Sequence, residues 1–384
     1  MAKNKKKAVS KVDKESAPKK KVANSAKIKE LEDRISTTKY NKKTQHAIGL
    51  YKAQIAKLKE KQESRSKSGP KFEGYQVSKS GDATVILVGF PSVGKSTLLN
   101  SLTGAESEVG AYEFTTLSVV PGMMEYKCAK IQILDVPGIV RGAASGKGRG
   151  REVLSCIQNA DLILMVLDVF NPQYLKVIEK EIRDSHVRVN EDRPDVKIVK
   201  TGKGGIHVGA TLKLTHLTEE TTKAICKEMR IVNADVIIRD DITVDQLIDI
   251  IENNKIYMPA IRVLNKIDMV SEKKLKELNA KLNIDVDISA DKKINIDSLK
   301  EKIFNDLNLI RIYTKEINKK PDMTEPMIVK HGMTIREFCA KLHKDFVNKF
   351  RFVRVWGKSA KFPGQKLHLN HVLRDDDIVE IHIN

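Results

Sequence analysis

Residues 89–96 read Gly-Phe-Pro-Ser-Val-Gly-Lys-Ser, a G-x-x-x-x-G-K-[ST] pattern typical of a loop that wraps a phosphate chain. Its glycines let the backbone curl so that successive N–H groups point at phosphate oxygens, and the helix that follows adds its positive N-terminal end. Lys95 would reach the β- and γ-phosphates, and the Ser96 hydroxyl would bind Mg²⁺. The residues predicted to surround the phosphates are Gly89, Phe90, Pro91, Ser92, Val93, Gly94, Lys95, Ser96 and Thr97.

A second motif, Asn265-Lys-Ile-Asp268, predicts which base accompanies these phosphates. It directly follows an apolar run, where a base would lie in an α/β fold of this kind. The Asp268 carboxylate can accept hydrogen bonds from guanine N1–H and the exocyclic amine, whereas adenine would leave a buried carboxylate unpaired. We therefore predict GTP rather than ATP. The other residues expected at the base are Asn265 facing its N7 edge, Lys266 packing along it, and Ser289 with Ala290 offering a backbone N–H to the guanine carbonyl oxygen.

The metal and the γ-phosphate have their own candidate residues. Asp135-Val-Pro-Gly138 matches a D-x-x-G motif, in which Asp135 would hold Mg²⁺ through water and the Gly138 N–H would face the γ-phosphate. Residues 112–117 lie where a first switch is expected, and Thr116, preferred to Thr115, would complete the Mg²⁺ shell only when the γ-phosphate is present. The alternative is that the two threonines belong to a plain strand. The further residues predicted at the nucleotide are Phe114, Thr115, Thr116, Asp135, Val136, Pro137 and Gly138; Ser96, Thr116 and Asp135 are the predicted metal ligands, and Lys95, Thr116 and Gly138 the predicted catalytic groups.

The type of the residue after Gly138 predicts slow hydrolysis of GTP. Ile139 stands where Ras-like enzymes carry the glutamine that orients the attacking water, and an aliphatic side chain cannot orient water. Residues 141–151 are rich in glycine and predict a mobile second switch. Arg141 or Arg149 could act on the γ-phosphate, but we favour a solvated or RNA-facing role for both.

Short apolar runs separated by helical segments predict the elements that position these residues. They indicate a mostly parallel sheet with helices on both faces. The expected strands are residues 83–88, 129–135, 162–168, 260–264 and 284–288, and the first helix is residues 96–102. Residues 172–238 are predicted to form a small inserted α+β domain. It would hold a hairpin of residues 196–200 and 206–214 around Gly202–Gly205, flanked by helices at 174–184 and 219–230, with residues 243–254 a helix of the main domain.

The two ends of the chain differ from its centre. Residues 1–25 predict a disordered Lys-rich leader, and residues 26–80 a helical hairpin with a linker. The GTPase domain is expected over residues 81–310. Residues 311–384 predict a β-grasp module with one long helix at 335–347 and strands at 310–313, 327–329, 353–356 and 378–383.

The net charge of +19 is concentrated at these ends. Residues 1–80 hold 23 Lys and Arg against 8 Asp and Glu, and residues 311–384 hold 15 against 9. A nearly neutral centre between basic ends favours a polyanionic partner, ribosome or structured RNA, although Lys-rich tails can also serve solubility alone. No apolar run is long enough to span a membrane, and the four scattered cysteines are typical of reduced thiols, so we expect a cytoplasmic protein. We also expect it to be a monomer.

The motifs together resemble the developmentally regulated GTP-binding (DRG) proteins of the Obg-like branch of translation-factor GTPases. Residues 89–97, 112–117, 134–139 and 146–152 carry the resemblance, and residues 40–50 and 355–359 extend it toward both ends. It implies a P-loop GTPase domain, an N-terminal helical hairpin, an inserted domain similar to one from a small-subunit ribosomal protein, and a C-terminal TGS module. It also implies action on or near ribosomes and, in eukaryotes, a zinc-finger regulatory protein as partner.

One position departs from the potassium-activated relatives, which carry Asn where this chain has Ser92. A hydroxyl binds K⁺ more weakly than an amide oxygen, so stimulation by K⁺ is a hypothesis here. Two other functions remain open at this point. The chain could be an RNA-binding scaffold that GTP stabilises with little turnover, or a DNA-binding regulator that uses its helical hairpin, although no sequence-reading helix is evident.

Overall fold

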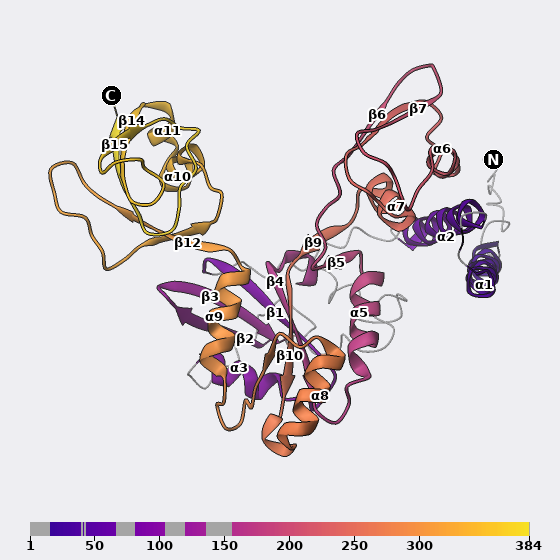
Figure 1. Ribbon diagram of the computed structural model, residues 1–384, viewed down its shortest axis with the longest axis horizontal. Helices are drawn as coiled ribbons and strands as arrows, with labels where there is room; N and C mark the ends of the chain where they lie inside the picture. The colour runs from indigo at the N-terminus through magenta and orange to yellow at the C-terminus, as the bar shows by residue number, and fades with distance from the viewer. Residues whose placement is uncertain are drawn as a thin grey trace, which may run out of the picture. The chain divides into compact units, whose positions relative to one another are not determined.

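The computed structural model describes residues 16–39, 41, 44–66, 81–103, 120–135 and 156–383 (Figure 1). The chain divides into two compact units, residues 1–73 with 192–255 and residues 74–191 with 256–384. The inserted segment therefore leaves the second unit after residue 191 and returns to it at residue 256. Within the described ranges, no helix combines the length and the apolar character needed to cross a bilayer.

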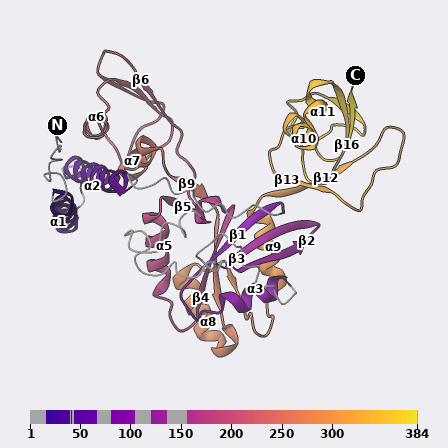
Figure 2. The same ribbon diagram turned by 180° about the vertical axis from the view of Figure 1, so that it is seen from behind.

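A six-stranded sheet forms the centre of the second unit, with strand order β11-β10-β4-β1-β3-β2 (Figures 1 and 2). All neighbours pair in parallel except β2 with β3, so the predicted mostly parallel sheet is confirmed. Every residue of β4 is buried, as expected for a strand covered on both faces. The strands are β1 (Ala83–Val88), β2 (Val120–Tyr126), β3 (Ala129–Asp135), β4 (Leu162–Asp168), β10 (Ala260–Asn265) and β11 (Val286–Asp287).

Helices supply the other half of this core through their apolar faces. Leu98 and Leu102 of α3, Ile178 of α5 and Leu299 of α9 all belong to the same buried cluster as the strands. The helices are α3 (Lys95–Thr103), α5 (Tyr174–Asp184), α8 (Glu272–Leu282) and α9 (Ile296–Asp306), with a short 3-10 helix η1 (Ile267–Met269). A two-stranded parallel pair, β5 (Val187–Val189) with β9 (Ile256–Met258), lies where the inserted segment leaves and returns.

The first unit joins the N-terminal hairpin to the inserted segment. Helices α1 (Ser16–Thr37) and α2 (Gln45–Ser66) confirm the predicted helix pair. The predicted start of this helix pair is wrong. Helix α1 begins at Ser16 and not at Ala26. The stretch before Ala26 is rich in Lys and Ala, which favour helix, and Pro18 lies in the first turn, where proline is tolerated.

Helix α2 packs on α6 (Glu219–Glu228) and α7 (Val244–Glu252) of the inserted segment. Ala53 of α2 is fully buried in one cluster with Ile225 of α6 and Leu247 of α7. Ion pairs join the same helices, Lys52 with Asp245 at 2.6 Å and Lys57 with Glu228 at 2.9 Å. The hairpin and the insertion therefore share a single core.

Both bounds of the predicted insertion, residues 172–238, are wrong. Helix α5, predicted within it, buries Leu175, Ile178 and Ile182 against the six-stranded sheet. Helix α7, predicted to belong to the main domain, lies in the core of the insertion instead. The insertion runs from Asp192 to Lys255. An amphipathic pattern shows that a helix has a buried face, but it does not say which neighbour that face meets.

The predicted hairpin within the insertion is also wrong. Strands β6 (Val196–Lys200) and β7 (Ile206–Ala210) do not pair, because β8 (Ala234–Ile238) lies between them. β8 pairs with β6 in antiparallel and with β7 in parallel orientation. Residues 202–205 thus carry the chain past a third strand, a connection in which Gly204 and Gly205 adopt positive φ.

The C-terminal domain has a five-stranded sheet of order β13-β12-β16-β14-β15, in keeping with the predicted β-grasp module. The predicted helix at 335–347 is in fact two helices. His343 is extended between them (φ −166°, ψ 146°), and its ring accepts a hydrogen bond from the Asp345 N–H, which caps the second helix. The elements are β12 (Leu309–Thr314), β13 (Met327–Lys330), α10 (Ile335–Leu342), α11 (Lys344–Asn348), β14 (Phe350–Trp356), β15 (Gln365–Leu367) and β16 (Asp377–Ile383).

Candidate nucleotide site

The carboxyl ends of the parallel strands bring the sequence motifs to one edge of the sheet. The loop after β1 holds residues 89–94, β3 ends at Asp135 and β10 ends at Asn265. Parallel pairing of β1 with β3 and of β10 with β4 fixes their relative positions along the strands. This edge is the usual position of a ligand in an open α/β sheet.

Two glycines permit close approaches that the loop requires. A Cβ on Gly89 would lie 2.5 Å from the carbonyl oxygen of Val166 in β4. A Cβ on Gly94, whose φ is +94°, would meet the Asn265 amide nitrogen far inside contact distance. Ser92 also adopts a left-handed conformation, with φ of 64°. The loop therefore curls tightly against β4 and β10, as the motif predicts.

Lys95 is held inside the mouth of this loop. Its Nζ donates to the carbonyl oxygens of Gly89 and Phe90, both at 3.1 Å. Burial lowers the pKa of Lys95, and the nearby Asp135 carboxylate opposes that effect. A phosphate chain would supply charged acceptors in place of the two carbonyls, and charge-assisted hydrogen bonds are the stronger kind.

Ser96 and Asp135 provide the oxygen ligands that Mg²⁺ prefers. The Ser96 hydroxyl donates to Asp135 Oδ2 at 2.9 Å. The second carboxylate oxygen, Oδ1, is buried and has no hydrogen-bond partner among the residues that the structure describes. Because an unpaired buried carboxylate oxygen is costly and Mg²⁺ takes hard oxygen ligands, these two residues fit the ion.

Asn265 ties the motif predicted to read the base to the loop predicted to hold the phosphates. It is 2% exposed, and its Nδ2 donates to the Val93 carbonyl oxygen at 2.9 Å. Its Oδ1 accepts from the Lys266 N–H at 2.8 Å and from the Ala290 N–H at 3.0 Å. The Ala290 N–H would have to share or exchange this bond to reach a guanine carbonyl oxygen, so that contact and the one to N7 stay predictions.

Lys266 lies across the phosphate loop. Its Nζ donates to the Ser92 carbonyl oxygen at 2.7 Å and lies 3.7 Å from the Asp168 carboxylate at the end of β4. Asp168 in turn accepts from the Asn171 N–H at 2.8 Å. A lysine stretched in this way presents its methylene groups beside the loop, which suits the predicted packing along a base.

Asp268 is kept ionised beside these loops. Its side chain is 11% exposed and lies 3.4 Å from Lys292 Nζ. A hydrogen bond from the Ser289 hydroxyl holds the pKa of Asp268 below its ordinary value, against desolvation, and Lys292 adds to the effect. At neutral pH the carboxylate is therefore an acceptor, as recognition of two guanine donors requires.

Some neighbours of the site were not predicted. Phe90 stacks on Tyr174 at the start of α5, with ring centroids 3.8 Å apart. The Ser101 hydroxyl donates to the Ala290 carbonyl oxygen at 2.7 Å, which links α3 to the loop after β11. Asp168 could have been suspected from its position at a strand end, but Tyr174 and Ser101 carry no signal in the spacing of the motifs.

The predicted switch residues lie outside the described residues. This holds for Phe114, Thr115, Thr116, Val136, Pro137 and Gly138, and for Ile139, Arg141 and Arg149. Their predicted roles at the γ-phosphate and at Mg²⁺ remain predictions from the sequence.

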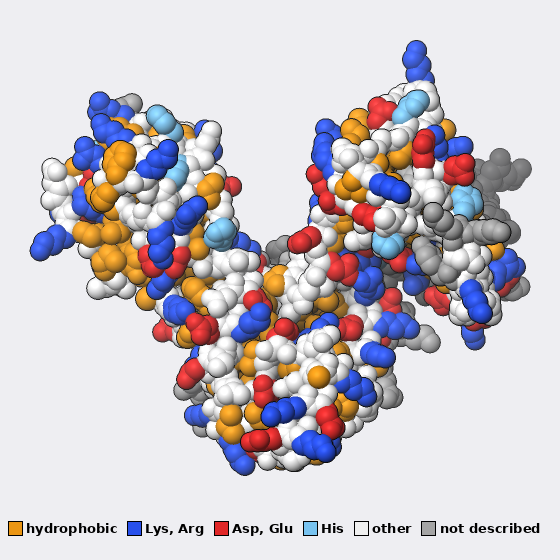
Figure 3. All heavy atoms as spheres, viewed as in Figure 1, with side chains coloured by type: hydrophobic (Ala, Val, Ile, Leu, Met, Phe, Trp, Pro, Cys, Tyr) orange, Lys and Arg blue, Asp and Glu red, His pale blue; other side chains and the backbone are white. Residues whose placement is uncertain are grey.

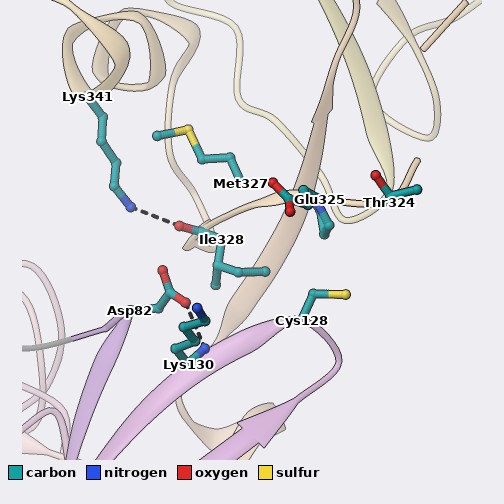
Figure 4. A pocket seen from close by; sticks show the side chains of 9 residues that line it. Asp82, Cys128, Lys130, Thr324, Glu325, Met327, Ile328 and Lys341 are labelled. Atoms are coloured by element: carbon teal, nitrogen blue, oxygen red, sulfur yellow. Dashed lines mark hydrogen bonds between the residues drawn. The ribbon is translucent and has the colours of Figure 1, made fainter. Parts of the chain in front are cut away.

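A hollow of about 390 Å³ lies elsewhere in the second unit (Figure 4). Asp82, which precedes β1, and Lys130 in β3 line it, together with residues 324–328 and Lys341. Lys341 Nζ reaches the Ile328 carbonyl oxygen at 2.8 Å, as Figure 4 shows. Because the phosphate loop follows the end of β1, this hollow is at the opposite end of the strands and is not part of the nucleotide site.

Replacing Asn265 by Asp is expected to weaken the link between the two loops. The carboxylate would keep both accepted bonds but would set an anion against the Val93 carbonyl oxygen in place of a donor. We expect a loss of about 1–3 kcal/mol in the free energy of unfolding and a matching loss of nucleotide affinity. Thermal unfolding and GDP titration measure both. Asn348→Asp, an exposed change in α11, is the control; equal effects of the two variants would contradict the assigned role.

Comparisons with known proteins show which family models and relatives match this chain. A family model described as "50S ribosome-binding GTPase" matches residues 84–201, "C-terminal region of MMR_HSR1 domain" matches residues 203–309, and "TGS domain" matches residues 310–383. An uncharacterized GTP-binding protein of Methanocaldococcus jannaschii is 53% identical over 92% of this chain and 91% of its own length. Developmentally-regulated G-protein 3 of Arabidopsis thaliana is 46% identical over 92% of this chain and 97% of its own length. Developmentally-regulated GTP-binding protein 1 of Xenopus laevis is 46% identical over 93% of this chain and 98% of its own length.

Proposed function

Because this chain belongs to the developmentally regulated GTP-binding proteins, we propose that it hydrolyses GTP slowly and acts as a ribosome- or RNA-associated switch in translation. Membership of this family of P-loop GTPases makes it a GTP-binding protein and confirms the resemblance seen in the motifs. The TGS module at its C-terminus is confirmed as well. The rate, the partner and the cellular process belong to the proposal.

The bond from Asn265 Nδ2 to the Val93 carbonyl oxygen is the observation that carries the nucleotide assignment. It joins the loop predicted to read the base to the loop predicted to hold the phosphates. A ligand with both parts, such as GTP, would engage the two loops together. In this proposal Asp268 selects guanine, and Lys95 with the N-terminus of α3 neutralises the phosphates.

Ser96 and Asp135 would hold Mg²⁺, with Thr116 as the predicted third ligand from the first switch. The ion would neutralise charge on the phosphates when it is bound. The chain itself orients the triphosphate through the loop N–H groups and Lys95, and the Gly138 N–H is predicted to stabilise the γ-phosphate. Because Ile139 replaces the glutamine that would orient the attacking water, the proposal includes a low intrinsic rate of GTP hydrolysis.

A potassium ion is a further proposed cofactor, and Ser92 provides its test. Ser92 has a left-handed backbone, which Asn tolerates better than most residues, so Ser92→Asn should fold. An amide oxygen would bind K⁺ better than a hydroxyl does. We expect GTP hydrolysis to be faster in KCl than in NaCl, and this ratio to rise by roughly threefold or more in Ser92→Asn, about 0.7 kcal/mol. Equal rates in both salts for both proteins would exclude K⁺.

The basic ends of the chain support an anionic partner such as the ribosome. The excess of positive charge lies in residues 1–80 and 311–384, whereas the centre of the chain is nearly neutral. The matching family model also carries ribosome binding in its description. We propose a cytoplasmic monomer that binds ribosomes or structured RNA and that, in a eukaryote, works with a zinc-finger regulatory protein.

Pelleting of ribosomes with the full chain tests the switch. We expect co-sedimentation to depend on whether GDP, GTP or a non-hydrolysable GTP analogue is present, and single-turnover hydrolysis to rise when ribosomes are added. If pelleting did not depend on the nucleotide and ribosomes did not change the rate of GTP hydrolysis, the switch would be rejected. The RNA-binding scaffold that GTP stabilises would then be the better function. Preferential binding of duplex DNA in a parallel assay would favour the DNA-binding regulator.

A further inference from the structure

Two positions inside the phosphate loop are held by residues that its motif does not include. The pattern G-x-x-x-x-G-K-[ST] fixes the two glycines, the lysine and the hydroxyl residue, and leaves the four positions between the glycines open. Phe90 and Ser92 occupy two of these open positions. The Phe90 ring contacts a ring of α5, and the Ser92 carbonyl oxygen contacts Lys266. The conformation of the loop therefore depends on side chains outside it.

Phe90 is held through its ring. The ring lies against that of Tyr174, the first residue of α5, with centroids 3.8 Å apart and planes 13° apart. Phe90 is 7% exposed, and Tyr174 packs against the same buried cluster as the sheet. The preceding Gly89 lies so close to β4 that a Cβ there would collide with the Val166 carbonyl oxygen. The start of the loop is therefore fixed at its backbone by β4 and at its side chain by α5.

Fixing Phe90 also fixes an acceptor of the loop lysine. The Phe90 carbonyl oxygen accepts from Lys95 Nζ at 3.1 Å, so a held Phe90 directs Lys95 into the mouth of the loop before a phosphate arrives. Charged side chains of both signs lie on the visible side of this domain (Figure 3), and a charge placed beside the loop would attract or repel the phosphates. Two uncharged rings hold the loop without that effect.

A buried carboxylate sets the position of Tyr174. Asp168, at the end of β4 and 6% exposed, accepts from the backbone N–H groups of Phe170 at 3.2 Å and Asn171 at 2.8 Å. The Asn171 carbonyl oxygen in turn accepts from the Tyr174 N–H at 3.1 Å. Because α5 starts without a side-chain cap at Gln173, this turn begins the helix and places Tyr174.

The same carboxylate lies beside the second contact. Lys266 Nζ is 3.7 Å from Asp168 Oδ2 and donates to the Ser92 carbonyl oxygen at 2.7 Å. Asp168 therefore supports both contacts of the loop, that of Tyr174 with Phe90 and that of Lys266 with Ser92. β4 is buried along its whole length, which makes its end a rigid base for both.

We propose that Tyr174 is a positioning residue, which holds the phosphate loop in its nucleotide-binding form through the stack on Phe90. The inference rests on the nucleotide site of the proposed function and is independent of the ribosome. A loop that already has the bound shape does not have to be ordered by the ligand. Without the stack only a fraction of the molecules hold the loop in that shape, and the measured affinity falls by that fraction.

Replacing Tyr174 by Leu removes the ring and keeps an aliphatic side chain. Loss of the stacked pair is expected to weaken GDP binding roughly three- to tenfold. Tyr174→Phe keeps the stack and should restore the affinity of the parent protein. Guanosine, which lacks phosphates, should bind all three proteins equally, because Asn265 retains its bonds to Lys266 and Ala290. Calorimetric titration with GDP, and competition of guanosine with labelled GDP, measure the two affinities.

Tyr126→Leu is the matched control. Tyr126 in β2 also packs on the buried cluster of the sheet, and it forms an edge contact with Phe304, with centroids 6.0 Å apart. It pairs with Ala129 at the start of β3, the end opposite to Asp135. The change should lower the melting temperature and leave GDP affinity unaltered. If it weakened GDP binding as much as Tyr174→Leu does, the cause would be a general loss of stability, and the positioning role would be rejected.

Phe90→Leu tests the stack from the side of the loop. If the two rings act as a pair, Phe90→Leu weakens GDP binding as Tyr174→Leu does, and the double variant loses no more than either single variant. Additive losses would mean that the rings act separately and would overturn the proposal. Equal losses for GDP and guanosine in Tyr174→Leu would overturn it too, since the stack would then support the whole site instead of the phosphate loop.

These outcomes are distinguishable from a failure of the proposed switch. Ribosome pelleting that ignores the nucleotide would reject the switch, while a selective loss of GDP affinity in Tyr174→Leu would keep the positioning role. Nucleotide-dependent pelleting together with normal GDP binding by Tyr174→Leu would do the reverse.

Discussion

Replacing Asp268 by Asn is expected to exchange the base that this protein binds. A carboxylate can accept from both donors of guanine, whereas an amide offers one acceptor and one donor. Loss of one charged hydrogen bond, with a guanine donor left facing a donor, costs about 3 kcal/mol, or roughly 100-fold in GTP affinity. Xanthine carries a carbonyl where guanine has its amine, so xanthosine triphosphate should bind Asp268→Asn more tightly than it binds the parent protein.

Competition between labelled GDP and each unlabelled nucleotide measures this exchange. Asp291→Asn is the matched control, since Asp291 is exposed in the same loop that carries Lys292. It should leave the preference for guanine unaltered. If Asp268→Asn also kept that preference, Asp268 would not read the base, and the nucleotide site would have to be assigned again.

Replacing Gly94 by Ala is expected to remove binding of GDP and GTP alike. The new methyl group would require a left-handed backbone and would collide with the Asn265 amide. Asn265 would have to release Val93, Lys266 or Ala290, which would detach the base loop from the phosphate loop. We expect a loss of at least about 3 kcal/mol, or 100-fold in affinity.

A glycine without such neighbours provides the control. A Cβ on Gly209 in β7 would meet no atom within 4 Å, so Gly209→Ala should bind nucleotide normally. Calorimetric titration measures the affinity, and circular dichroism shows whether each variant is folded. Normal binding by Gly94→Ala would mean that the contact between the two loops does not matter for the ligand.

These motif residues could be placed from the sequence because each follows a strand whose apolar run is unambiguous. The predicted strands at residues 83–88, 129–135 and 162–168 have the observed bounds. Parallel strands put their carboxyl ends at one edge, so the loops after them had to meet. The site was therefore predicted as a set of loops, although its internal bonds were not.

The pairing of strands and the packing partners of helices could not be predicted in the same way. The alternation in β6 and β7 shows that each has one buried face, but not that β8 separates them. Helix α5 and helix α7 are both amphipathic, yet they pack in different units. Such choices depend on contacts between residues far apart in the chain, which a local pattern does not contain.

The break at His343 has a different origin. The apolar positions of residues 335–347 fit one continuous helix, so the periodicity alone predicts no interruption. A side chain that caps the following turn competes with the helix for the backbone at that point. Such a competition is decided by small differences between two local arrangements and is hard to foresee.

The shared core of α2 with α6 and α7 has a consequence for the order of events during synthesis. Helix α2 is complete at Ser66, but its partner α7 ends only at Glu252. At about 5–20 residues per second, the nascent hairpin waits roughly 10 to 40 s before α6 and α7 are both available to cover Ala53. Chaperones thus have a defined interval in which to shield this early segment, and a translational pause before Glu252 would prolong its exposure.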